Sequence, residues 1–297
     1  MSTADSVAVG AAEAPRRSHM SIWWRFRRHR LALFGSVVLA VFCFMAVAAP
    51  IVAVQDAFEV DLKNIKASPT FSHILGTDAG GRDLWARLVY ASRISLSVGL
   101  VAALIASAIG TVIGLVSGYA GGWVDNLLMR FTELIMTLPT FFLLIVAASL
   151  FGRSVINIML IIGFLGWTGK ARLVRGQVLS LKELDYVTAA RAIGANARRI
   201  SIVHIFPGTV PYVVVSATLT VGGAILSEAG LSFLGLGVNF TTPTWGNLMN
   251  AAQSLHVLQH QPWVWLPPGF AIGMTVISVN FVGDGLRDAL DPRTKID

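Results

Sequence analysis

Six apolar segments, each about as long as a helix that crosses a lipid bilayer, divide this chain. A helix needs about 20 mainly apolar residues to cross the hydrocarbon. The segments extend over about 31–54, 94–118, 130–151, 155–173, 208–227 and 263–283. In lipid, a helix satisfies all its backbone hydrogen bonds within one segment. The sequence therefore predicts an all-α integral membrane protein with six transmembrane helices.

The positions of the basic residues predict the orientation of these helices. The chain is 55% hydrophobic and only 13% charged, with a mean hydropathy of +0.68, yet its formal charge is +7. Placing the N-terminus inside puts 17 of the 23 Lys and Arg residues on the inner side. Lys and Arg prefer the cytoplasmic side of membrane proteins. Both termini are therefore expected in the cytoplasm, and nucleic acid is not expected as a partner.

The same pattern predicts how the chain is divided. Residues 1–20 are expected to form a disordered cytoplasmic N-terminus, 31–283 the transmembrane domain, and 284–297 a cytoplasmic tail. Long outer loops are expected at about 55–93 and 228–262, and a long inner loop at about 174–207. Residues 21–30 combine Trp23 and Trp24 with basic side chains, which is typical of an interfacial elbow helix, although simple flanking charge is an alternative.

The inner loop contains a helix, a turn and a second helix. Ser180 and Glu183 have the spacing of a capping box, which predicts the start of a short helix. Gly194 can take the left-handed conformation that ends such a helix, and Asn196 can cap the next one. The first helix is expected to turn Leu184, Val187, Ala190 and Ile193 toward one side. Its small residues Thr188, Ala189 and Ala190 would form a slim face for a partner's groove.

Small residues and one acid are the other features near membrane depth. Small side chains recur every four residues in the second span, which predicts close helix packing at Ala102, Ala106, Gly110, Gly114 and Gly118. Glu228 lies just after the fifth predicted span. Its carboxylate could belong to a transport pathway or gate, or could make structural hydrogen bonds in the turn that follows.

Cofactor motifs are not found in the sequence. The stretch Gly163–Ala171 departs from a phosphate-binding loop at Phe164 and Ala171, and no spaced Cys and His set predicts a metal site. Cys43 is the single cysteine, so it has no partner for an intramolecular disulfide. The chain is expected to bind no cofactor itself, and any ATP would bind to another polypeptide.

The inner loop also resembles the signature loop of bacterial ABC-importer permeases. That signature is Glu-Ala-Ala, three residues, Gly, nine residues and then Ile-x-Leu-Pro; here Thr188 replaces the Glu, and Ala189, Ala190, Gly194 and Pro207 match. Other stretches are similar to the C-type permease subunit of the dipeptide, oligopeptide and nickel branch. These are residues 73–99, 118–130, 171–195, 228–238 and 282–293.

The resemblance implies a transport subunit that is not itself an enzyme. It implies a multi-pass protein of a bacterial cell membrane, paired with a homologous second permease, two ATPase subunits that hold ATP and Mg, and an extracytoplasmic substrate-binding protein. Peptides would cross by alternating access. The implied ATPase-coupling residues are Asp185, Thr188, Ala189, Ala190, Arg191, Gly194, Ala195 and Pro207.

Two alternatives to peptide import follow from the same analysis. A permease of the same branch could carry nickel or another small solute. An ion-coupled secondary transporter is the alternative from a different class, and it predicts inverted repeats and charged groups at mid-membrane.

Overall fold

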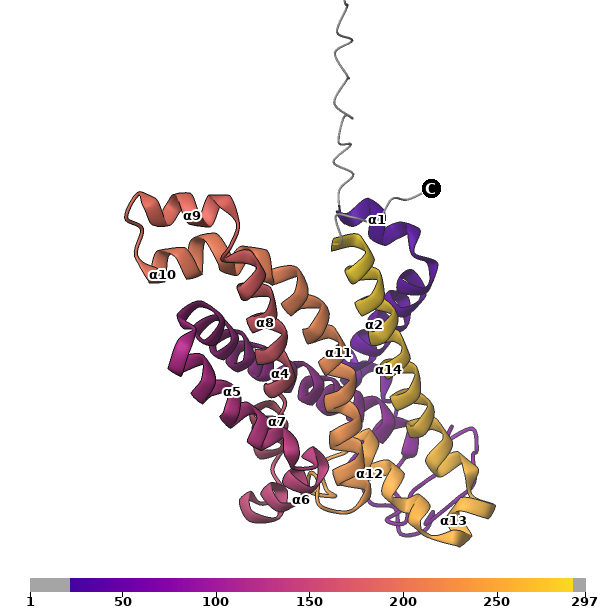
Figure 1. Cartoon of the computed structure of the whole chain (residues 1–297). Coiled ribbons are helices and arrows are strands. Elements are labelled where there is room, and N and C mark those ends of the chain that lie inside the picture. Colours follow the sequence, from indigo (N-terminus) through magenta and orange to yellow (C-terminus); the bar gives the residue numbers. More distant parts are fainter. Residues whose placement is uncertain (1–21, 291–297) are drawn as a thin grey trace, which may run out of the picture.

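The structure is a computed structural model that describes residues 22–290 of the chain. Within that range the regular structure is helical, apart from one isolated bridge between Thr77 and Asp83. Figure 1 shows long helices side by side, with α9 (Asp185–Ala192) and α10 (Ala197–Arg199) projecting at the same end as α1 (Ile22–Arg28). The short helices α12 (Trp245–Met249) and α13 (Leu255–His260) lie at the opposite end.

Five helical segments within the described residues are long and apolar enough to cross a membrane, and a bent pair makes a sixth. This confirms the predicted all-α fold with six spans. The straight segments are α2 (Arg30–Val47), α4 (Leu84–Ala120), α7 with α8 (Val155–Leu165, Thr168–Leu181), α10 through α11 (Ala197–Phe233) and α14 (Pro262–Leu290). A four-residue helix, α3 (Ala49–Val52), follows α2.

The third predicted span is not one straight helix. It consists of α5 (Gly122–Thr137) and α6 (Thr140–Phe151), which are bent by 84° relative to one another. Pro139 disfavours the helical conformation of the residue before it, and Leu138 is accordingly extended, with φ −86° and ψ 134°. The prediction of one continuous helix over 130–151 was wrong, because Pro139 interrupts the helix within this apolar run.

The spans begin and end further out than the apolar segments predicted. Helix α4 begins at Leu84, where the Asp83 side chain accepts a hydrogen bond from the Ala86 N–H at 2.7 Å. Helix α11 (Phe206–Phe233) continues beyond residue 228, and α14 continues to Leu290. The predicted loops 55–93, 174–207 and 228–262 and the tail 284–297 are thus partly helical, because hydropathy marks only the part of a helix within hydrocarbon.

The terminal regions are covered only in part. Helix α1 confirms a helix within the predicted elbow, with Arg28 stacked 3.9 Å over the Trp24 ring. Its position at a membrane interface stays a prediction. The predicted disordered segment 1–20 and the end of the tail, 291–297, lie outside the described residues.

The small residues of α4 form a close contact, but with a helix of the same chain. An added Cβ would come within 2.6 Å of the Lys170 Cβ at Gly110, and within 2.7 Å of the Val174 and Val178 Cβ atoms at Gly114 and Gly118. Ala106 is fully buried. These four positions therefore let α4 pack tightly, with the three glycines meeting α8.

Replacing Gly114 with leucine should destabilise the chain itself. The added side chain would overlap the Ala171 carbonyl and Val174, and overpacking of this kind costs about 1–3 kcal/mol. We expect a lower midpoint of thermal unfolding in detergent. Gly176→Leu is the matched control, because a Cβ at Gly176 of α8 meets nothing within 4 Å. Equal midpoints for both variants would contradict this packing.

Trp245 anchors the end of the bundle that carries α12 and α13. It is fully buried, and its ring contacts Phe42 of α2 edge-on with ring centroids 5.4 Å apart. Its indole N–H donates to the Leu88 carbonyl of α4 at 3.3 Å, and its backbone N–H donates to the Ser95 hydroxyl at 3.1 Å. Helix α12 is thereby fixed to α2 and α4.

Candidate functional site

The predicted inner-loop helix exists as α9, and an apolar cluster fixes it to the bundle. Val187 is fully buried and Ala190 is 6% exposed. Val187 packs with Val174 and Val178 of α8 and with Ile200 and Ile205 of a π-helical turn (Ile200–Ile205). The Tyr186 hydroxyl donates to the His204 carbonyl at 3.2 Å. Helix α9 is therefore held by α8 on one side and by the entry to α11 on the other.

Gly194 ends α9 in the way that the sequence predicted. Its φ is +86°, in the left-handed region that glycine adopts without penalty. The Gly194 N–H donates to the Arg191 carbonyl at 3.0 Å, and the Ala195 N–H donates to the Ala190 carbonyl at 3.1 Å. This pair of bonds is a Schellman motif. The backbone at Gly194 thus sets the direction in which the chain leaves α9.

The second predicted helix is also present, and Asn196 caps it. The Asn196 side-chain oxygen accepts from the Arg199 N–H at 2.8 Å, and α10 begins at the next residue. The helix leads without a break into the π-helical turn and then into α11. The segment between α8 and the fifth span is therefore a helix, a turn and a second helix, with the Gly194 turn and the Asn196 cap between them.

The predicted capping box at Ser180 and Glu183 was wrong. Helix α8 continues to Leu181, so Ser180 lies within it and donates to the Gly176 carbonyl at 3.3 Å. Helix α9 begins after Leu184, which makes no side-chain cap. Leu184 and Ile193 are exposed, not turned inward with Val187. The capping pattern was misleading because α8 packs on α4 along its whole length.

The predicted coupling residues divide into an exposed and a buried set. Ala190 packs inward, so the slim face expected from Thr188, Ala189 and Ala190 consists of Thr188 and Ala189 alone. Ala195 is half-buried beside the apolar cluster. The exposed members are Asp185, Thr188, Ala189, Arg191, Gly194 and Pro207. These exposed residues include Asp185 and Arg191, which carry opposite charges, and the small side chains of Thr188 and Ala189.

Glu228 lies inside α11 and not in a turn, because the helix continues to Phe233. Its side chain is fully buried. The Ser232 hydroxyl donates to one carboxylate oxygen at 2.7 Å, and the Ser95 hydroxyl reaches the other at 3.5 Å. Ser95 also accepts from the Trp245 N–H. Of the two roles considered, this geometry supports the structural one, since Glu228 joins α11 to α4 and α12.

Sequence reasoning missed one buried lysine and one ion pair between helices. Lys170 was assigned to the inner side, but it is 6% exposed, and its ammonium donates to the Ser216 carbonyl at 3.4 Å and to the Thr220 hydroxyl. Arg175 makes a two-pronged ion pair with Asp125, with both N–O distances at 2.6 Å. Asp125 and Arg175 are far apart in sequence, so no local pattern could have paired them.

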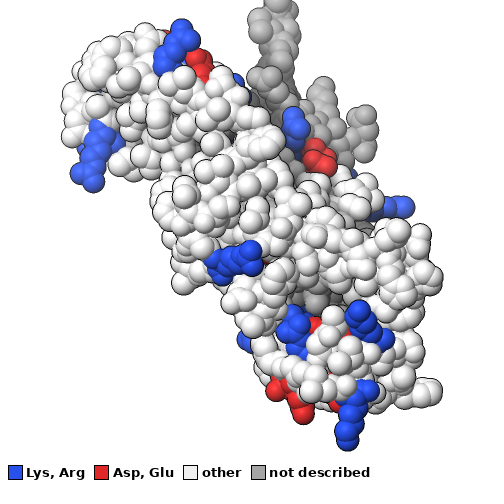
Figure 2. All heavy atoms as spheres, turned by 90° about the horizontal axis from the view of Figure 1, so that it is seen from below, with Lys and Arg blue, Asp and Glu red and all other residues white. Residues whose placement is uncertain are grey.

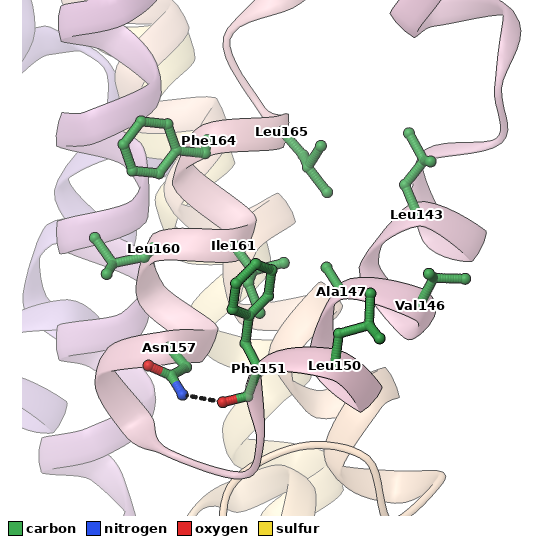
Figure 3. Close-up of a pocket in the computed structure, with 10 residues that line it drawn as sticks. All are labelled: Leu143, Val146, Ala147, Leu150, Phe151, Asn157, Leu160, Ile161, Phe164 and Leu165. Atoms are coloured by element: carbon green, nitrogen blue, oxygen red, sulfur yellow. Dashed lines mark hydrogen bonds between the residues drawn. The ribbon is translucent and has the colours of Figure 1, made fainter.

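The cavity between α6 and α7 is almost wholly apolar. Figure 3 shows side chains of both helices facing this space of 540 Å³, and the one side-chain amide, Asn157, donates to the Phe151 carbonyl. Over the described residues, no group of three His, Cys, Asp or Glu side chains could hold a metal. Figure 2 shows that most of the surface seen from the α12 and α13 end is uncharged.

A bundle of helices that are long and apolar enough to cross a membrane defines a multi-pass membrane protein. Residues 110–296 match the family described as binding-protein-dependent transport system inner membrane component. Residues 20–69 match the N-terminal transmembrane domain of oligopeptide transport permease C. The chain belongs to this family, and it is a membrane permease subunit of an ABC transporter that works in a complex with other subunits.

Several named proteins are similar in sequence to this chain over nearly its whole length. A protein of Brucella suis biovar 1 named as a peptide permease is 41% identical over 92% of this chain and 90% of its own length. The dipeptide transport system permease protein DppC of Alkalihalophilus pseudofirmus is 38% identical over 91% and 88%. The glutathione transport system permease protein GsiD of Shigella flexneri is 40% identical over 92% and 90%.

Proposed function

We propose that this chain is one of two permease subunits in an ATP-driven importer of short peptides in a bacterial cell membrane. The observation that supports the substrate class is that the similar proteins are named as permeases for peptides, dipeptides and glutathione. Glutathione is itself a tripeptide. The proposed complex contains a homologous second permease, two ATPase subunits and an extracytoplasmic binding protein.

The mechanical part of the proposal concerns α9. Its buried side is fixed to α8 and to the entry of α11, while Thr188 and Ala189 face outward at the end of the bundle. A rigid helix held in this way can act as a lever when a partner pushes on it. We propose that α9 docks on an ATPase subunit, and that closure of the ATPase pair moves α8 and α11 and switches the access of the pathway. ATP and Mg would bind to the ATPase subunits and not to this chain.

The proposed substrate is tested by uptake into vesicles that contain the assembled complex and its binding protein. We expect ATP-dependent uptake of a labelled dipeptide, with competition by other short peptides and none by nickel ions. Uptake of nickel but not of peptide would support the alternative within the branch. Gradient-driven uptake by this chain alone, without ATPase subunits, would support an ion-coupled transporter instead.

Cysteine labelling tests the proposed orientation, in which both termini and α9 are cytoplasmic. Ile193, which directly follows α9, and Gln259 on α13 are exposed, and the two helices lie at opposite ends of the molecule. In a Cys43→Ala background, an impermeant thiol reagent should label Ile193→Cys only from inside and Gln259→Cys only from outside. The reverse pattern would require both termini to lie outside the cell.

A further inference from the structure

Asp125 and Arg175 join α5 to α8, and we propose that this ion pair transmits the movement of α8 to α5 during transport. Both would be positioning residues, because they act through the helices that carry them. The inference rests on the proposed coupling role of α9. It extends that role by naming the contact through which movement of the inner loop reaches the bent third span.

Asp125 and Arg175 form a bidentate ion pair, which fixes the relative orientation of the two side chains. Arg175 donates from Nε to one carboxylate oxygen of Asp125 and from Nη2 to the other, both at 2.6 Å. The Ser117 hydroxyl of α4 donates to the same carboxylate. The Asp125 side chain is 12% exposed and that of Arg175 is 33% exposed. Two-pronged guanidinium–carboxylate pairs fix orientation as well as distance, so rotation of α8 would carry Asp125 with it.

Helix α5 contacts α4 and α8 within this chain, and few of its side chains are buried there. Among its residues only Asp125 and Thr132 are buried, whereas most of its large apolar side chains are exposed. Besides the ion pair, α5 contacts the start of α8 through the stacking of Phe131 on Trp167, with ring centroids 6.3 Å apart. Stacked rings can slide past one another, while a two-pronged ion pair cannot do so without breaking.

Helix α5 lies between two sharp turns of the backbone. Gly121 and Gly122 precede or begin the helix with φ of +63° and +54°, and a Cβ on either would meet nothing within 4 Å. At the other end, Leu138 and Pro139 separate α5 from α6 with the 84° bend. Because α5 lies between two turns, we propose that it follows the helix to which its buried carboxylate is paired, which is α8 through Arg175, while Ser117 of α4 holds the same carboxylate by a single hydrogen bond.

Helix α8 is the element through which α9 would pass on its movement. Val174 and Val178 flank Arg175 on α8 and share an apolar cluster with Val187 of α9. Only three residues separate the end of α8 from the start of α9. Because α8 and α9 share a core, a displacement of α9 would displace Arg175 and, through the ion pair, α5.

Spin-label distances in the complete complex, assembled with its ATPase subunits, test this inference. In a Cys43→Ala background, one label at Phe44→Cys on α2 serves as the reference, and the second is placed at Leu127→Cys on α5 or at Leu173→Cys on α8. Distances are compared without nucleotide and with ATP and vanadate. In the otherwise unmodified chain we expect both distances to shift.

Asp125→Asn should keep the distance shift measured at α8 and lose the one measured at α5. The neutral amide has only one acceptor oxygen, so it cannot accept both hydrogen bonds from the guanidinium. Arg175→Lys keeps the positive charge but cannot make the bidentate pair, so it should give an intermediate distance shift at α5. This variant tests the inference if Asp125→Asn assembles poorly. Glu133→Gln is the matched control, since it breaks an exposed ion pair with Arg130 on the same helix. It should leave both shifts intact.

The outcomes separate this inference from the coupling proposal. A full shift at α5 in both Asp125→Asn and Arg175→Lys would overturn the inference and leave the coupling role of α9 intact. If the distance to α8 does not respond to nucleotide in the unmodified chain, the coupling proposal itself is overturned, and this inference with it.

Discussion

Replacing Gly194 with valine is expected to uncouple ATP hydrolysis from transport in the assembled complex. Gly194 has a φ of +86°, where a β-branched side chain is strongly disfavoured. Holding a non-glycine residue in such a conformation costs about 1–3 kcal/mol. This cost shifts the equilibrium between the native backbone conformation at residue 194 and other conformations by roughly 5- to 150-fold, in favour of the others. The Schellman bonds from Gly194 and Ala195 would be lost, and α9 would no longer present the same face.

The measurements are peptide uptake and the stimulation of ATP hydrolysis by the binding protein, both of which should fall steeply. Basal nucleotide binding by the ATPase subunits should not change. Gly194→Asn is the matched control, because asparagine tolerates the left-handed region, and it should keep most of the activity. A Cβ at this position meets nothing within 4 Å in this chain, so bulk alone cannot explain a difference between the variants. Equal, normal activity in both would remove α9 from the coupling mechanism.

Replacing Trp245 with alanine should cost more stability than any other single change considered. The ring is fully buried between α2 and α4, and truncation of a buried tryptophan typically costs about 3–5 kcal/mol. The Leu88 carbonyl would also lose its hydrogen bond from the indole. We expect a markedly lower midpoint of thermal unfolding and a poor yield of the purified chain.

The control for this variant is Trp123→Ala on α5, where the side chain is 76% exposed. It removes the same ring from a position without buried contacts, so the unfolding midpoint should hardly move. If the two variants lowered the midpoint equally, α12 would not be an anchored part of the fold, and the end of the bundle that carries α12 and α13 would have to be packed differently.

The local features of the inner loop were predictable where short-range backbone chemistry decides them. Gly194 and Asn196 act within four residues of their own positions, so their roles follow from the sequence, and both were confirmed. The capping box at Ser180 has equally good local chemistry, yet the packing of α8 on the α4 glycines outweighs it. A cap stabilises a helix by about 1 kcal/mol, which continuous packing of a further turn can exceed.

The sequence by itself determined that this chain crosses a membrane about six times, because the length and apolarity of a span are required by the bilayer and are readable residue by residue. Only the tertiary structure decided which groups meet. It buried Ala190, placed Lys170 against α11, joined Asp125 to Arg175, and gave Glu228 its partners on α4 and α11. Contacts between helices distant in sequence depend on how those helices turn and approach one another, and a linear pattern of residues does not contain that information.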